Sequence, residues 1–193
     1  MPKQLSPIKR IQIIEAAESL IAELGFRGLS MHKVAKRAGI SAGTIYHYFT
    51  DKEHLIHQVR QHVAQRIANE VQHNIDDAMS VKQRHQVICL NIWNLSESNQ
   101  SVISNRVQYE SLPTDDRRDI QIREQKLFHQ VHKMLNQGKQ QNILKPLANE
   151  ILICLGFEPL LSIVRKKNWG IIPHQPDGID AIIEASWDAI IQH

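Results

Sequence analysis

Two short helical segments joined by Gly39-Ile40-Ser41 constrain the fold of this chain more than any other feature. The first segment begins at Ser30, and Val34 lies on its apolar side. Gly39 ends it, because glycine readily adopts the left-handed conformation found after helix C-termini. Ser41 then caps the second segment, in which Ile45 and Phe49 are four residues apart and share one face. This spacing is typical of a helix-turn-helix.

Helical signals extend along the rest of the chain. Ser6 followed by Pro7 predicts the start of a first helix, which Gly25 ends, and Thr50 with Glu53 predicts a capping box for a fourth helix. Valine, isoleucine and tyrosine never alternate convincingly with polar residues, so the predicted fold class is all-α. Later helices are expected over 119–137 (closed by Gly138), 146–166 (with a kink or break at Pro159) and 179–191, and connections over 96–101 and 111–118.

Composition indicates a globular protein, with 42% hydrophobic and 22% charged residues in 193. Cys89 and Cys154 both lie in apolar runs, which disfavours a disulfide scaffold and favours a reducing compartment. The start of the chain is too polar for a signal peptide, and the apolar run Ile151–Phe157 is too short to span a membrane. We therefore expect a cytoplasmic protein with no membrane partner.

Charge is distributed unevenly. Residues 1–60 contain nine Lys or Arg and five Asp or Glu, whereas the whole chain has a net charge of +3. The asymmetry is either ordinary scatter or the mark of a module that binds a polyanion such as nucleic acid.

Motifs for catalysis are missing from the sequence. It contains no glycine-rich phosphate loop, nucleophile elbow or His-Glu-x-x-His run. The histidine pairs His54/His57 and His129/His132 could each share a cation, but no cysteine or carboxylate cluster completes a recognised site. The sequence predicts a protein that is not an enzyme and has no cofactor and no metal site.

The run from Gly28 to Leu55 resembles the DNA-binding domain of the TetR/AcrR family of bacterial transcriptional regulators. The resemblance depends on Val34-Ala35, Gly39-Ile40-Ser41, Gly43-Thr44-Ile45-Tyr46, Tyr48-Phe49 and Asp51-Lys52-Glu53 with Leu55. It implies a helix-turn-helix domain over 1–54 and an all-helical domain for effector binding and dimerisation over 55–193.

The resemblance also implies which residues contact DNA. The helix 42–48 would enter the major groove as the recognition helix. His32 stands where the family often has a base-reading arginine, which puts a bidentate contact to guanine in doubt. Tyr46 and Tyr48 could instead be packing residues. The expected DNA contacts are Ser30, Met31, His32, Ala42, Gly43, Thr44, Tyr46, His47, Tyr48 and Lys52.

Two apolar stripes in 146–166 indicate a helix buried on both sides, against its own core and against something else. The alternative is a monomer that buries both this helix and the last one internally. With the last helix, the family resemblance implies a dimer contact made by Ile151, Leu152, Leu155, Leu160, Ile182, Ile183, Trp187 and Ile190. It also implies an effector pocket, for which the candidates are Trp93, Tyr109, Phe128, His132 and Phe157, although side chains of this kind at helical spacing more often pack in the core.

The sequence as a whole predicts a homodimeric transcriptional regulator, acting as a repressor, that binds a palindromic operator in double-stranded DNA. An unidentified small-molecule effector would release it from the operator. The alternative is a DNA-bound scaffold of the same fold that recruits a protein partner and needs no small ligand.

Overall fold

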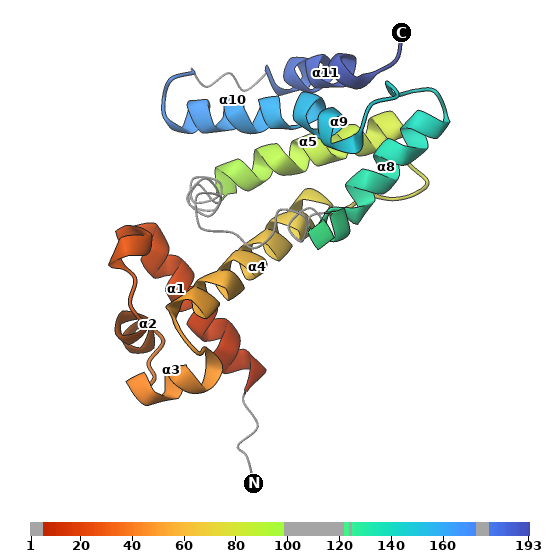
Figure 1. Cartoon of the computed structure of the whole chain (residues 1–193). Coiled ribbons are helices and arrows are strands. Elements are labelled where there is room, and N and C mark those ends of the chain that lie inside the picture. Colours follow the sequence, from red (N-terminus) through yellow and green to blue (C-terminus); the bar gives the residue numbers. More distant parts are fainter. Residues whose placement is uncertain (1–5, 99–121, 124, 173–177) are drawn as a thin grey trace. The chain divides into compact units, whose positions relative to one another are not determined.

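The computed structural model describes residues 6–98, 122, 123, 125–172 and 178–193. Every named element in this part of the chain is an α-helix, and the only β-type pairing there is an isolated bridge between Leu144 and Ile191. The predicted all-α class is confirmed. The helices in Figure 1 are α1 (Pro7–Gly28), α2 (Met31–Arg37), α3 (Ala42–Tyr48), α4 (Lys52–Val71), α5 (Val81–Ser98), α8 (His129–Gln140), α9 (Asn149–Gly156), α10 (Glu158–Asn168) and α11 (Ile179–Ile190).

The chain divides into two compact units, Met1–Arg66 and Ile67–His193. The division falls inside α4, whereas the expected domain boundary after residue 54 lies near the start of that helix. None of the helices in the described residues combines the length and hydropathy needed to cross a bilayer.

The first unit is a small helical core in which α1 packs against α2 and α2 against α3. Ser6 caps α1 by accepting a hydrogen bond from the Lys9 amide, and Gly25 interrupts the helix with a φ of 66°. One more turn follows, to Gly28. Fully or almost fully buried apolar side chains from all four helices fill this unit: Ile13, Ile14, Ala17, Leu20, Ile21, Val34, Ala35, Ile45, Phe49, Leu55, Val59 and Val63.

The cap of α4 differs from the predicted pairing of Thr50 with Glu53. Asp51 caps the helix instead, because its Oδ1 accepts a hydrogen bond from the His54 amide at 2.7 Å. A carboxylate at this position also interacts favourably with the positive end of the helix dipole. Thr50 turns to the Asp51 carboxylate and the His54 ring.

The second unit places α5 against α8, α10 and α11, and α9 against α8, α10 and α11. In Figure 1, α10 and α11 lie side by side above α5. Its core includes Ile88, Cys89, Met134, Leu135, Leu144, Leu152, Leu160, Ile183, Trp187 and Ile190.

Helix bounds in this unit differ from expectation at α8 and α5 and agree with it at Pro159. Gly138 does not end α8; it lies buried inside the helix, which continues to Gln140. The expected helix over 146–166 is two helices, α9 and α10, which meet at Phe157, and Pro159 lies in the first turn of α10. This is the break that Pro159 predicted, since proline has no N–H to donate inside a helix. The α5 helix includes residues 96–98, which were expected in a connection, and the predicted connections between 99 and 118 lie outside the described residues.

Candidate DNA-binding surface

The turn between α2 and α3 is built by local hydrogen bonds. Gly39 has a φ of 66°, and the Ile40 amide donates to the Ala35 carbonyl at 3.0 Å, which closes the end of α2. Ser41 Oγ accepts a hydrogen bond from the Thr44 amide at 3.1 Å and so begins α3. The glycine and the serine therefore act as the sequence predicts.

One face of α3 is anchored in the core and the other is exposed. Ile45 and Phe49 have no exposed surface, whereas Ala42, Gly43 and His47 are exposed and Tyr46 is 56% exposed. Thr44 is half-buried, and its Oγ1 lies 2.7 Å from Ser41 Oγ. Tyr48 is also half-buried. A rigid helix thus presents two small residues and several hydrogen-bonding groups to solvent.

The other predicted DNA contacts differ in their exposure to solvent and in the hydrogen bonds that they make. Ser30 caps α2 by accepting a hydrogen bond from the Lys33 amide, and His32 is exposed. Met31 is 8% exposed and belongs to the core of the first unit, and its contact with DNA stays a prediction. The α2 side chains at 31, 34 and 35 all face inward, which a seven-residue helix requires to stay packed.

Lys52 is half-buried, and its Nζ donates to the Phe26 carbonyl at 3.0 Å. Lys33 Nζ makes a similar contact with the Gly28 carbonyl at 2.9 Å. Both ammonium groups therefore satisfy carbonyls at the end of α1, where cations also interact favourably with the helix dipole. Contact between Lys52 and a phosphate remains a prediction.

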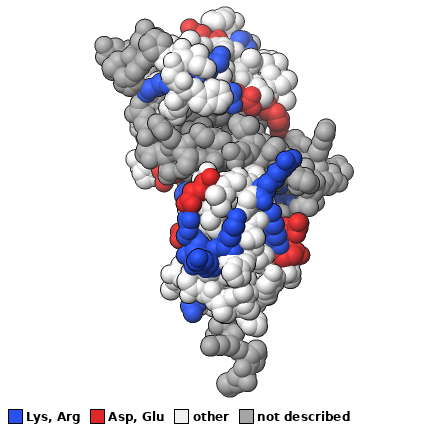
Figure 2. Space-filling model, turned by 90° about the vertical axis from the view of Figure 1, so that its left-hand side faces the viewer, with Lys and Arg blue, Asp and Glu red and all other residues white. Residues whose placement is uncertain are grey.

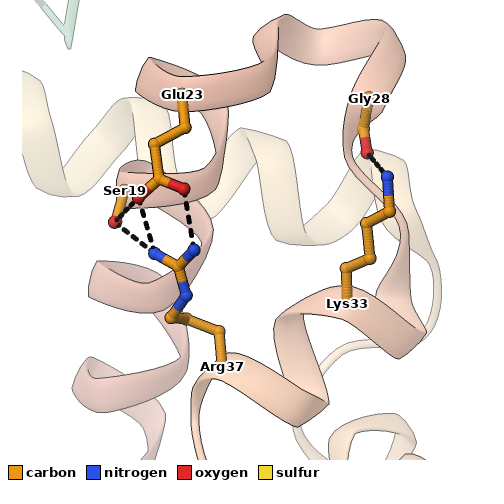
Figure 3. A network of polar contacts seen from close by, with 5 residues as sticks. All are labelled: Ser19, Glu23, Gly28, Lys33 and Arg37. Atoms are coloured by element: carbon orange, nitrogen blue, oxygen red, sulfur yellow. Dashed lines mark hydrogen bonds and ion pairs between the residues drawn. The ribbon is translucent and has the colours of Figure 1, made fainter.

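Sequence reasoning missed the side chains that hold α2 on α1. The two terminal nitrogens of Arg37 each donate to a different Glu23 oxygen at 2.7 Å, and one of them also donates to Ser19 Oγ at 2.8 Å. Figure 3 shows this fork and, beside it, the Lys33 contact. The hydrogen bonds from Arg37 and then from Ser19 lower the pKa of Glu23 to about 2. The spacing of Arg37 from Glu23 in the sequence carries no signal of this pairing, because the two residues lie on different helices.

Arg10 is a second positioning residue. Its guanidinium lies 5.3 Å from the centre of the Phe49 ring and donates to Gln58 Oε1 at 2.5 Å. These contacts tie α1 to the end of α3 and to α4, so they hold α3 in place within the first unit. Figure 2 shows Lys and Arg side chains gathered on one face of the first unit, which is the charge distribution expected of a polyanion-binding surface.

The predicted pocket residues do not come together in one cavity. Trp93 lines an apolar groove of about 450 Å³ with side chains of α10 and α11, and His132 lines a separate polar groove on α8. Phe157 is core, with its ring 5.2 Å from that of His85, and Phe128 packs partly buried against the same core. Tyr109 lies outside the described residues.

The residues of the predicted dimer contact differ in how far one copy of the chain encloses them, and the contact itself stays a prediction. Five of its residues are 4% exposed or less and are enclosed by their own unit: Leu152, Leu160, Ile183, Trp187 and Ile190. The stripe they form faces inward because α9 and α11 pack on each other and on the core. Ile151 and Leu155 remain 48% and 38% exposed on α9, and Ile182 is half-buried.

Comparisons with known proteins agree with this geometry. Residues 13–59 match the family described as "Bacterial regulatory proteins, tetR family", and residues 80–191 match "Tetracyclin repressor-like, C-terminal domain". An HTH-type transcriptional regulator from Haemophilus influenzae is 30% identical over 181 residues, which are 93% of this chain and 94% of that protein.

Two solved structures are similar over almost the whole chain. A TetR-family regulator from Vibrio parahaemolyticus has 53% identity and a TM-score of 0.88, over 96% of this chain and 100% of that one. A TetR-family regulator from Haemophilus influenzae has 28% identity and a TM-score of 0.86, over 98% and 100%. The sequence motif, the helix-turn-helix geometry and these matches together place the chain in the TetR family of helix-turn-helix transcriptional regulators.

Proposed function

We propose that this regulator binds a palindromic operator as a homodimer, represses transcription there, and leaves the DNA when a small-molecule effector binds the second unit. The observation that carries the proposal is the exposed face of α3, opposite the buried anchors Ile45 and Phe49. An α-helix fits the major groove of B-DNA, where side chains can distinguish all four base pairs.

The residues on that face suit close contact with bases. Ala42 and Gly43 allow the start of α3 to approach the groove, while Thr44, Tyr46 and His47 supply hydroxyl and imidazole groups. Thymine methyl groups and base acceptors are the partners that such side chains use. Ser30, His32, Tyr48 and Lys52 lie on neighbouring turns, where contacts to phosphates would set the orientation of α3.

A single seven-residue recognition helix makes few base contacts, so two copies are needed for adequate affinity and specificity. The dimer contact we infer uses the outward sides of α9, α10 and α11. Ile151 and Leu155 are exposed there, and Ala181 and Ala185 on α11 line the apolar groove beside them. Small alanines would let a helix of the second copy approach closely.

Release by an effector requires that the effector bind one conformation of the dimer better than another. The conformation with the higher effector affinity would separate the two recognition helices by a distance that no longer matches the operator. The result is lower DNA affinity, with no contact between effector and DNA.

Selection of bound sequences from a random double-stranded DNA pool tests the proposal. We expect a two-fold palindrome whose half-sites are about one helical turn apart, with an affinity that falls steeply with salt. His47→Ala should weaken binding by about tenfold to a hundredfold and relax the preference at one position of each half-site. His129→Ala, on the exposed surface of the second unit, is the matched control and should bind as the wild type does.

If no palindrome is enriched from the pool, the result would contradict the proposal that a homodimer binds a palindromic operator. Equal loss of binding in the His47 and His129 variants would contradict the assignment of α3 as the recognition helix.

A further inference from the structure

The second unit buries a charged side chain that has no counter-ion among the described residues. Arg84, on α5, is 1% exposed and is the largest of the fully buried side chains. One terminal nitrogen donates to Gln137 Oε1 on α8 at 2.6 Å. Among the described residues this is the only side-chain hydrogen bond of Arg84, and its buried Nε has no partner.

Gln137 is neutral, so the hydrogen bond does not compensate the charge. Buried charges in proteins are normally paired, because taking an ion out of water costs several kcal/mol. The charge of Arg84 lowers the pKa of Asp77. However, the Asp77 carboxylate accepts a hydrogen bond from Lys133 Nζ at 2.5 Å. Lys133 is also the main cause of the lowered pKa of Asp77, and Arg84 is the smallest cause. Within the described part of the chain, Arg84 therefore has no ion-pair partner of its own.

Gln137 stands between Arg84 and a groove that runs along α8. The groove has a volume of about 740 Å³, and it is lined by Gln125, His129, His132, Lys133, Asn136, Gln137, Gln140 and Gln141. The side chains that line the groove carry amide, imidazole and ammonium groups, which can hydrogen-bond a polar ligand. Gln137 is therefore the side chain that links the buried guanidinium to the groove.

We propose that this groove binds a small organic anion whose carboxylate or phosphate group replaces the Gln137 amide on Arg84. A guanidinium presents two parallel N–H groups that match the oxygens of either anion, and Lys133 supplies a second cation in the same groove. The bound anion would supply the missing counter-ion. This inference rests on the proposed function and deepens it, since it names the chemical class of the effector. Because anion binding is measured without DNA, its failure is distinguishable from a failure of operator binding.

Gln137→Glu tests the proposal, because it places a carboxylate of the protein where the anion would bind. Calorimetric titration and thermal unfolding would use inorganic phosphate and succinate as probes, with chloride at matched ionic strength. We expect saturable binding of phosphate or succinate to the wild type and a higher unfolding midpoint with that anion. Without added anion, the variant should unfold at a higher temperature than the wild type, and it should bind the anion at least about tenfold more weakly.

Gln140→Glu is the matched control, because it adds the same charge to the same helix and groove at an exposed position. It should bind the anion with nearly the affinity of the wild type. Arg84→Lys keeps a cation but loses the guanidinium fork, so a folded Lys variant should bind more weakly than the wild type. A response to succinate alone identifies a carboxylate ligand, and a response to phosphate alone identifies a phosphate ester.

Three results would overturn the proposal. They are the absence of saturable binding of either probe to the wild type, equal stabilisation by phosphate, succinate and chloride, and binding by Gln137→Glu that equals that of Gln140→Glu.

Discussion

At the scale of single residues, the second unit contains an imidazole that burial keeps neutral. His85 has no exposed surface; its ring centre lies 5.2 Å from that of Phe157 and 5.3 Å from that of Trp187. Its Nε2 lies 3.2 Å from Ser186 Oγ. Burial is the main cause that lowers the pKa of His85 from 6.5 to about 4, against smaller raising effects from the Gly156 carbonyl and Glu184.

This lowered pKa makes stability depend on pH. Between about pH 6.5 and pH 4 the unfolded chain binds a proton at His85 that the folded chain does not bind. The contribution of His85 to stability is therefore complete above about pH 6.5 and is lost as the pH falls toward 4, by roughly 3 kcal/mol in all. Urea unfolding at several pH values should show a shallower decline for His85→Leu than for the wild type.

His129→Ala, which removes an exposed histidine from the same unit, is the control and should keep the wild-type decline. If His85→Leu and the wild type lose stability in parallel between pH 6.5 and 4, His85 is not the source of the dependence.

At the scale of helices, two glycines have opposite surroundings. A Cβ added at Gly138 would lie 2.6 Å from Leu144 Cγ and Cδ1 and 3.1 Å from Val81 Cγ1, whereas one added at Gly43 would meet only Ser41 Oγ at 4.0 Å. Leu144 is 1% exposed and cannot move aside freely. Gly138 is thus the point of close packing between α8 and the segment that follows it, and Gly43 faces solvent.

Alanine should consequently have different effects at the two positions. Gly138→Ala gains about 1 kcal/mol of helix propensity but forces an overlap that costs about 1–3 kcal/mol, so its unfolding midpoint should fall. Gly43→Ala should unfold at the wild-type temperature or slightly higher, yet bind the selected operator more weakly, because the methyl group projects from the exposed face of α3. Thermal unfolding and operator titration of both variants measure these effects.

Wild-type operator affinity in Gly43→Ala would show that the start of α3 does not approach DNA closely. An unchanged midpoint in Gly138→Ala would show that Leu144 repacks at little cost.

At the scale of the whole molecule, the proposed dimer makes operator binding depend on association through the second unit. Leu155→Glu places a charge on the exposed side of α9 without entering the core. We expect this variant to remain helical by circular dichroism, to be monomeric by light scattering, and to lose most of its operator affinity. Ile8→Glu, at a 70% exposed position of α1, is the control for association and should stay dimeric. A dimeric Leu155→Glu would mean that copies associate through another surface.

The local features of this protein were determined by its sequence. Ser6, Gly39 and Ser41 act through hydrogen bonds and backbone conformations only a few residues away, so their roles do not depend on the rest of the fold. The same holds for the break near Pro159 and for the buried faces of α1 and α3, where the apolar spacing itself defines the face. The features around Gly39 and Ser41 sufficed to predict the helix-turn-helix, and the resemblance of the run from Gly28 to Leu55 implied the family.

Only the tertiary structure decided which of several suitable side chains are enclosed. Met31 is core although it starts α2 beside exposed His32, and Leu152 is buried although its neighbour Ile151 is exposed. The pairing of Arg37 with Glu23 and the burial of Arg84 likewise depend on helices that are distant in sequence. Burial is set by what packs across from a residue, and a helical period specifies a face without specifying its partner.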